Sequence, residues 1–311
     1  MVNFRYHLVS LIAVFLALGV GVVLGAGPLQ NAIDRNTNKG TGVGSAELSE
    51  ELAEADQQID QGEDFVWAMA QELLPQTLSG FDTAVIVLPG AAGVATDLVV
   101  RALEDANANV VGQVELTSRW DSNDSVTYRQ MLATAASPHL QTRPDQGDSD
   151  SILAQGLVEV LTQSSAQTDL VEQMLTDEQT ALVVPGTLPE KAATAIVLVG
   201  PSSVATERGS QEAAGTTSAS TDSDGSEPVT SAWSALAAAA SHAPAGAVAV
   251  GSAAQPTDFI AALREAAAPI ATVDEGGTAR ASLNVALALA SGAQGSYGQE
   301  QGASSPIAPL P

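Results

Sequence analysis

The hydrophobic pattern of the chain opens with one long apolar run. Residues 8–26 are apolar apart from Ser10, and no charged residue lies between Arg5 and Asp34. A helix of this length measures about 28 Å, close to the hydrocarbon thickness of a bilayer. We therefore predict an uncleaved transmembrane anchor in residues 1–30. The positive charge of Arg5 and the amino terminus favours a cytoplasmic N-terminus and an extracytoplasmic C-terminal domain.

Two other interpretations of this run stay open. A cleaved secretion signal would have a shorter apolar region and would place Pro28 directly behind the cut. A buried core helix would normally carry a polar face. Within the run, Ala17, Gly21 and Gly25 recur at every fourth position and share one helix face. Such a small-residue face favours self-association in the membrane, although glycine is also frequent in spanning helices that do not associate.

A second pattern follows a breaker-rich link at residues 31–45, and it predicts a helix over residues 46–75. Apolar or small residues recur there at alternating spacings of four and three, the heptad pattern of a helix with one apolar seam. The positions Leu52, Ile59, Val66 and Leu73 take the a sites of this heptad. The d sites are Leu48, Ala55, Gly62 and Met69.

The charges on this predicted helix have one sign. Eight acidic residues and no basic residue lie between Glu47 and Asp64. In a parallel homodimer Glu51 would face Asp56 of the other copy, so a strong homodimeric coiled coil is disfavoured. Either the helix binds a partner with basic flanking positions, or it packs along its own domain. The candidate partner-binding residues are Glu47, Glu50, Glu51, Leu52, Glu54, Asp56, Ile59 and Val66.

The remaining pattern, residues 81–293, predicts an α/β domain. Short, almost continuously apolar runs alternate with helical segments, which is typical of parallel strands covered on both faces. The best architecture is a doubly wound, mostly parallel sheet of the Rossmann or flavodoxin type. A helical insertion is predicted at 124–182, a disordered loop at 207–229 and a disordered tail at 294–311, and Asp258 is a predicted helix cap. The predicted strands are 83–90, 109–116, 194–201, 247–252 and 269–275.

Composition narrows the function. The 36 acidic and 11 basic residues give a net charge of −25, which argues against nucleic acid as a partner. The chain has no cysteine, which excludes thiol chemistry, and its histidines His7, His139 and His242 are scattered. The glycine loops 89–95 and 199–203 lack a nucleotide-binding fingerprint. No cofactor, catalytic residue or metal ligand is assigned, and we expect a protein that is not an enzyme.

Three stretches carry a resemblance to a known family. The segments HLVSLIAVFLALGVGVVLG at 7–25, ATVDE at 271–275 and SGAQGSYG at 291–298 resemble the actinobacterial MctB-like family of copper transport outer membrane proteins. The likeness extends over nearly the whole chain. It implies a role in copper efflux and homeostasis at the cell envelope, with the copper ion as cargo.

Two hypotheses of function remain open. The resemblance implies a membrane protein of copper export. The charge pattern and the single predicted span favour an anchored, non-enzymatic scaffold that binds an envelope protein, such as a cell-wall hydrolase or a division factor. In either case the membrane is a partner, and a homo-oligomer is possible through the predicted anchor.

Overall fold

The computed structural model describes residues 52–144, 147–202 and 226–311. The chain divides into two units, residues 1–62 and 63–311. In the first unit the described residues 52–62 are helical, and all of them are exposed. The predicted anchor lies outside the described residues. Among the described helices, none combines the length and the apolar composition that crossing a membrane requires.

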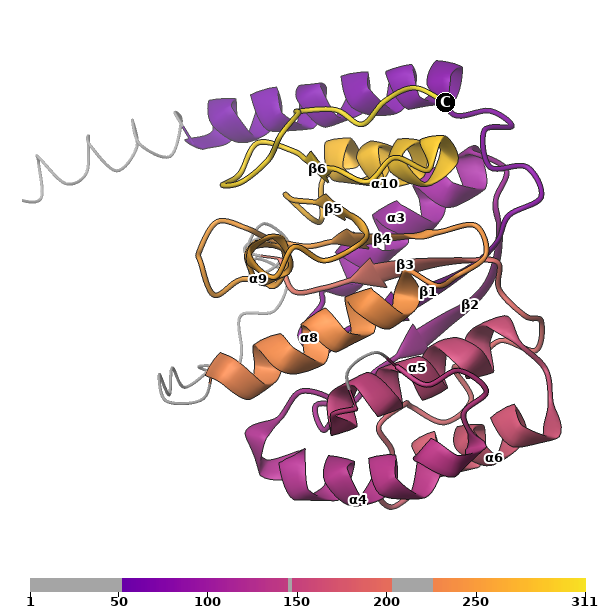
Figure 1. Cartoon of the computed structure of the whole chain (residues 1–311). Coiled ribbons are helices and arrows are strands. Elements are labelled where there is room, and N and C mark those ends of the chain that lie inside the picture. Colours follow the sequence, from indigo (N-terminus) through magenta and orange to yellow (C-terminus); the bar gives the residue numbers. More distant parts are fainter. Residues whose placement is uncertain (1–51, 145–146, 203–225) are drawn as a thin grey trace, which may run out of the picture. The chain divides into compact units, whose positions relative to one another are not determined.

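The second unit is built on one sheet of six parallel strands (Figure 1). The strand order is β2-β1-β3-β4-β5-β6. Its first five strands follow the 2-1-3-4-5 order of flavodoxin-like sheets, and they coincide with the five apolar runs predicted as strands. The predicted α/β class with a parallel sheet is therefore confirmed. The strands are β1 Asp82–Val87, β2 Asn109–Glu115, β3 Ala195–Val199, β4 Ala247–Val250, β5 Ala271–Val273 and β6 Ser296–Tyr297.

Helices cover both faces of this sheet, which explains why its central strands β3 and β4 are apolar throughout. Successive side chains of a strand point to opposite faces. Val85 of β1 packs on one side, whereas Ala84 and Ile86 pack on the other. The first face is covered by residues 63–73, α3 (Gly93–Asp105) and α10 (Ala279–Ser291).

The opposite face carries α5 (Ser149–Thr162), α8 (Ser226–Ala240) and α9 (Phe259–Glu265). Helix α5 packs between α8 on one side and α4 (Val126–Ala136) and α6 (Ala166–Leu175) on the other, as Figure 1 shows. Short 3₁₀ turns flank α4 at Asn123–Ser125 and Ser137–His139.

Buried charges hold together the helices between β2 and β3. The guanidinium of Arg129 donates to Asp150 at 2.9 Å and to the carbonyls of Arg119 and Ser122. Glu159, also buried, accepts the backbone N–H groups that follow α4. Because buried charges are tolerated only when they are paired or hydrogen-bonded, these contacts fix α4 and its following turn onto α5.

The predicted disorder of the C-terminal tail is wrong for residues 294–311. Ser296 and Tyr297 form β6, which pairs with the edge of β5, and Ala308 is buried. The tail has few large apolar residues, so its pattern is that of a loop. It is held instead by buried polar side chains from α9, β5 and α10, described below.

Two smaller expectations also need correction. The loop predicted at 207–229 lies outside the described residues up to position 225, but α8 already begins at Ser226. Asp258 precedes α9 as predicted, yet its carboxylate makes no capping bond to the helix. It accepts instead from the Ser252 hydroxyl at 2.7 Å and the Gln255 backbone N–H at 2.9 Å, since the preceding turn brings both donors to it.

Candidate functional site

An apolar groove opens on the outer side of α10. Residues 63–73 form one wall, α10 forms the floor, and the C-terminal tail forms the other wall. The groove has a volume of about 280 Å³. Its lining residues are Phe65, Val66, Met69, Leu73, Arg280, Leu283, Asn284, Pro306 and Ile307.

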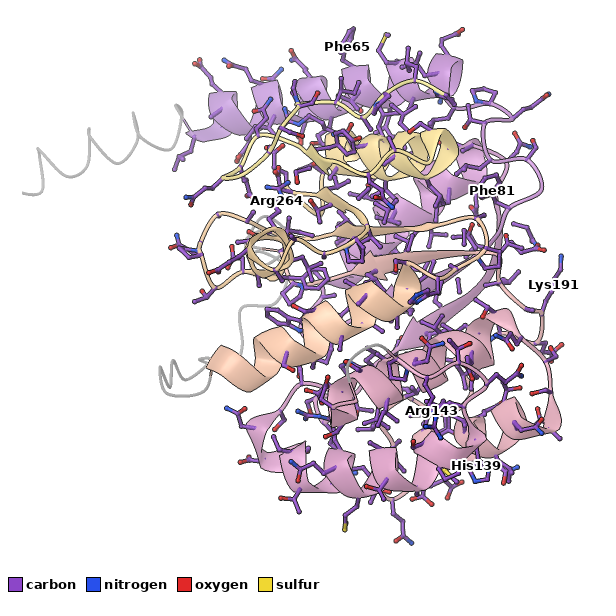
Figure 2. The ribbon with its side chains drawn as sticks, in the orientation of Figure 1. Phe65, Phe81, His139, Arg143, Lys191 and Arg264 are labelled. Carbon is purple, nitrogen blue, oxygen red and sulfur yellow. The ribbon has the colours of Figure 1, made fainter. Side chains whose placement is uncertain are left out.

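The local sequence explains why this groove is apolar and accessible. Trp67, Ala70 and Leu74 follow one another at spacings of three and four and are buried against the sheet domain. Because this stripe faces the sheet domain, apolar side chains on the other sides of the helix remain exposed. Phe65 is 67% exposed and Met69 is 41% exposed. The Phe65 side chain lies on the outer surface of the helix (Figure 2). Large apolar side chains grouped at a groove in this way are typical of interaction sites.

The Trp67 stripe settles how residues 63–73 pack. The interpretation that this helix packs along its own domain is correct for that part, and the Arg101 guanidinium lies 4.1 Å from the centre of the Trp67 ring. The predicted a/d seam is not the buried face, because Trp67 and Leu74 occupy b positions and Ala70 an e position. Val66, predicted to contact a partner, is half-buried against its own core and lines the groove.

The other described residues of the predicted partner-binding set are not among the residues that line the groove. Leu52 and Ile59 are 57% and 51% exposed in the first unit, together with exposed Glu54 and Asp56. Glu47, Glu50 and Glu51, and the small residues Ala17, Gly21 and Gly25, lie outside the described residues.

The charge around the groove is mainly negative. Asp64 and Glu72 are exposed on the same helix as Phe65 and Met69. The one cation in the lining, Arg280, is paired with Glu275. Glu63 accepts the backbone N–H of Ala279 at 2.6 Å at the first turn of α10, where a carboxylate is stabilised by the helix dipole. A ligand of this groove would meet apolar surface bordered by carboxylates.

A buried ionic cluster fixes the tail at the carboxyl edge of the sheet. Arg264 of α9 is paired with Asp274, which follows β5, at 2.8 Å, and the Asp274 side chain is fully buried. The same guanidinium donates to the carbonyls of Tyr297 and Gln301. Asp274 in turn accepts the Gln299 N–H at 2.8 Å. These bonds explain how a short polar segment is ordered without a large apolar contact.

The glycine loops at the same edge pack against protein. The sheet order reverses between β1 and β3, the position where doubly wound folds commonly bind ligands. There Gly90 lies beside Pro201, and the Phe259 ring fills the space next to Gly200 and Gly251. This agrees with the interpretation of these glycines as turn residues.

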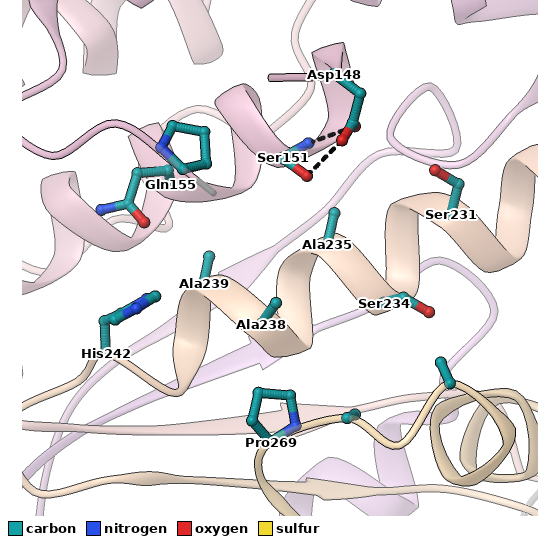
Figure 3. Close-up of a pocket in the computed structure, with 13 residues that line it drawn as sticks. Asp148, Ser151, Gln155, Ser231, Ser234, Ala235, Ala238, Ala239, His242 and Pro269 are labelled. Atoms are coloured by element: carbon teal, nitrogen blue, oxygen red, sulfur yellow. Dashed lines mark hydrogen bonds between the residues drawn. The ribbon is translucent and has the colours of Figure 1, made fainter. Parts of the chain in front are cut away.

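A second hollow, of about 370 Å³, lies between α5, α8 and the segment that leads into β5 (Figure 3). It is lined mainly by small residues of α8, with His242 and the buried amide of Gln155. The Asp148 carboxylate at its rim is occupied as the cap of α5, because it accepts from Ser151. Among the described residues, no group of three or more His, Asp or Glu side chains is placed to hold a metal ion.

Comparison with known proteins identifies the family. A family model described as copper transport outer membrane protein, MctB, matches residues 1–308. The chain belongs to the MctB family. The predicted resemblance is thereby confirmed over nearly the full length of the chain. A search of curated proteins finds no match.

The groove of this MctB-family chain includes residues that the sequence did not single out. Phe65 precedes an assigned a position and was not assigned to the seam, and Asn284 stands in an Ala- and Leu-rich helix. Pro306 and Ile307 belong to the predicted disordered tail. One feature of the sequence could have pointed to this site, namely the asparagine at position 284 within the apolar sequence of α10. A buried amide requires hydrogen-bond partners, so this residue implies that another segment packs on the helix.

The carboxylates near the tail predict a pH effect on stability. Burial raises the pKa of Glu300, and the charges of Asp274 and Asp258 raise it further, whereas a hydrogen bond from the Ala253 N–H lowers it. Burial likewise raises the pKa of Glu275. The folded chain therefore holds these protons more tightly than the unfolded chain does. The contribution to stability is largest below the ordinary value of 4.5 and is lost as pH rises through the raised folded pKa.

We expect the urea midpoint of Glu300→Gln to vary less than that of the wild type as pH rises from 4.5. An amide at this position can still accept from Ala253 but does not titrate. The exposed Glu190→Gln provides a matched control for the same chemical change. Identical pH profiles for wild type and Glu300→Gln would contradict the assignment.

Proposed function

We propose that this MctB-family chain functions in copper homeostasis at the cell envelope, as a single-span, membrane-anchored protein with an extracytoplasmic α/β domain. The family match over residues 1–308 supports this proposal. The apolar run at residues 8–26 supports the anchor, and self-association through Ala17, Gly21 and Gly25 remains part of it. Copper is the proposed cargo of the system, and no residue of this chain is assigned as its ligand.

The apolar groove favours a second candidate, a non-enzymatic scaffold or regulator that binds another envelope protein, such as a cell-wall hydrolase or a division factor. Exposed Phe65 and Met69 would supply the contact area, and Asp64 and Glu72 the neighbouring charge. Since the groove is apolar and bordered by carboxylates, the partner we propose is an amphipathic helix with apolar residues flanked by Lys or Arg.

A deletion strain separates the two candidates. Under the copper proposal, the strain grows poorly at copper concentrations that the wild type tolerates, and the full-length gene restores growth. Under the scaffold proposal, microscopy shows cells that divide but fail to separate, at ordinary copper concentrations. Normal copper tolerance in the deletion strain would contradict the copper role as the main function.

Groove variants test the partner-binding site directly. We expect Phe65→Ser in the full-length chain to reduce recovery of the co-purifying envelope partner by roughly tenfold or more, because a central aromatic contact often contributes about 2 kcal/mol. Met131→Ser is a matched control, since Met131 is 63% exposed on α4, away from the groove lining. Equal recovery with Phe65→Ser and with wild type would place the partner elsewhere on the chain.

A further inference from the structure

One wall of the groove is formed by the end of the chain, residues 306–311, here called the C-terminal strap. Only Ala308 of the strap is buried, whereas Ile307 and Leu310 are 48% and 61% exposed. The strap contains no helix or strand. A segment with so little buried apolar surface belongs to the least stable part of a fold and opens locally at low free energy.

A single buried amide holds this strap on α10. The side chain of Asn284 is 1% exposed. Its Nδ2 donates to the Pro306 carbonyl at 3.1 Å, and its Oδ1 accepts the Ala308 N–H at 2.9 Å. An asparagine amide has both a donor and an acceptor, so it bonds to the main chain on both sides of Ile307. Both bonds are made with backbone of the strap, so the amide recognises it without depending on its side chains.

The position of these bonds connects the strap to the groove. Pro306 and Ile307 line the groove, and so do Leu283 and Asn284 beneath them. Leu283 is 5% exposed. The preceding tail is anchored separately, because Arg264 binds the carbonyls of Tyr297 and Gln301. Loss of the Asn284 bonds would therefore free the strap while the rest of the tail stays attached.

We propose that Asn284 is a latch, and that the C-terminal strap is a displaceable wall whose release widens the apolar groove over α10. Asn284 is thus a positioning residue for the groove. The strap would regulate the site assigned above to partner binding, and to that extent the inference rests on the proposed scaffold function. The latch itself is a property of this chain alone and can be tested without a partner.

Cysteine labelling provides that test, because the chain contains no cysteine of its own. In full-length Leu283→Cys, the new thiol lies in the groove lining next to Asn284 and is nearly buried, so we expect slow reaction with N-ethylmaleimide. Adding Asn284→Ala is expected to increase the labelling rate about tenfold, as the loss of a buried hydrogen-bond pair would allow. Asn284→Asp keeps the acceptor for Ala308 but sets a carboxylate oxygen against the Pro306 carbonyl, so it should also label faster than Leu283→Cys alone.

Two controls keep the result interpretable. Position 310 is exposed in the latched state, so the labelling rate of Leu310→Cys should not respond to Asn284→Ala. A Leu283→Cys chain that ends at Ser305 retains Asn284 and should show the fast rate at its thiol, which covers the case in which Asn284→Ala does not fold. Unchanged labelling at position 283 in both the alanine variant and the shortened chain would overturn the proposal.

Partner binding is then measured as a separate result. The probe is a synthetic amphipathic helix of leucine and lysine, added to the full-length wild type and to Asn284→Ala. If labelling of the Leu283→Cys thiol responds as expected but neither the wild type nor Asn284→Ala binds the peptide, the latch stands and the proposed partner chemistry fails. If Asn284→Ala binds the peptide more tightly than the wild type does, the strap regulates the groove, whereas equal affinity would contradict that regulation.

Discussion

Replacing Gly200 with alanine is expected to destabilise the folded chain by about 3 kcal/mol, the upper part of the range for inserting a methyl group into a packed core. Gly200 follows β3, and a Cβ there would overlap Cδ1 of the Phe259 ring and lie 2.6 Å from its Cγ. Phe259 is 1% exposed and opens α9, so its ring has no free space to enter.

The Phe259 ring also contacts a tryptophan, whose fluorescence can report a change in packing. Phe259 packs edge-to-face on Trp233, with 5.5 Å between ring centres. We expect Gly200→Ala to lower the urea midpoint and to change tryptophan emission before unfolding. Gly93→Ala is the matched control, because no atom lies within 4 Å of the Cβ that it adds.

A second substitution identifies the cause of the loss. Phe259→Leu removes the ring atoms that the new methyl group would meet, so the double variant should lose less stability than the two single losses combined. Additive losses would show that the Gly200–Phe259 contact is not the source of the destabilisation.

The sheet could be predicted from the sequence because its signal is local. The runs around Val85, Val197 and Val248 are apolar on both faces, and only strands covered by helices on both sides require this. The parallel arrangement follows from alternation with helices, since parallel neighbours need a crossover connection. These inferences use residues that are close together in the sequence.

The tail and the groove could not be predicted because their interactions join distant residues. Arg264 bonds to Gln301, and Asn284 to Pro306 and Ala308. The spacing of hydrophobic residues does not predict such pairs, because each joins a polar side chain to a backbone group far away in the sequence. The polar tail was therefore predicted as disordered, although buried side chains hold it.

The helix preceding the domain shows a different limit. The sequence does contain a heptad repeat of apolar residues at its a and d positions. Other heptad positions, such as b and e, also carry apolar residues. The buried stripe of Trp67, Ala70 and Leu74 follows the packing of residues 63–73 against the α3 and α10 face, which selects another side of the helix than the a/d seam. Periodicity predicted the helix correctly, but the choice of buried face depends on the surface that the helix meets.

Removing Arg264 should produce the largest electrostatic loss in the described chain. In Arg264→Met the aliphatic part of the side chain is largely kept, but the fully buried Asp274 carboxylate loses its cation. Breaking one partner of a buried pair commonly costs about 3–5 kcal/mol, since the remaining charge is left without compensation. We expect a loss of that size in urea unfolding of the full-length chain, together with faster amide exchange in residues 297–301.

A surface pair in the same chain provides the matched comparison. Lys191 binds Asp82 at 2.7 Å, but the Lys191 side chain is 63% exposed. Figure 2 shows it at the surface, extending away from the fold. Lys191→Met should lose much less stability than Arg264→Met, because solvent screens the exposed pair. The double variant Arg264→Met with Asp274→Asn should recover part of the stability, since the amide is neutral and can still accept the Gln299 N–H. Equal losses for Arg264→Met and Lys191→Met would mean that the tail is held mainly by Asn284 and β6, and that Arg264 does not anchor it.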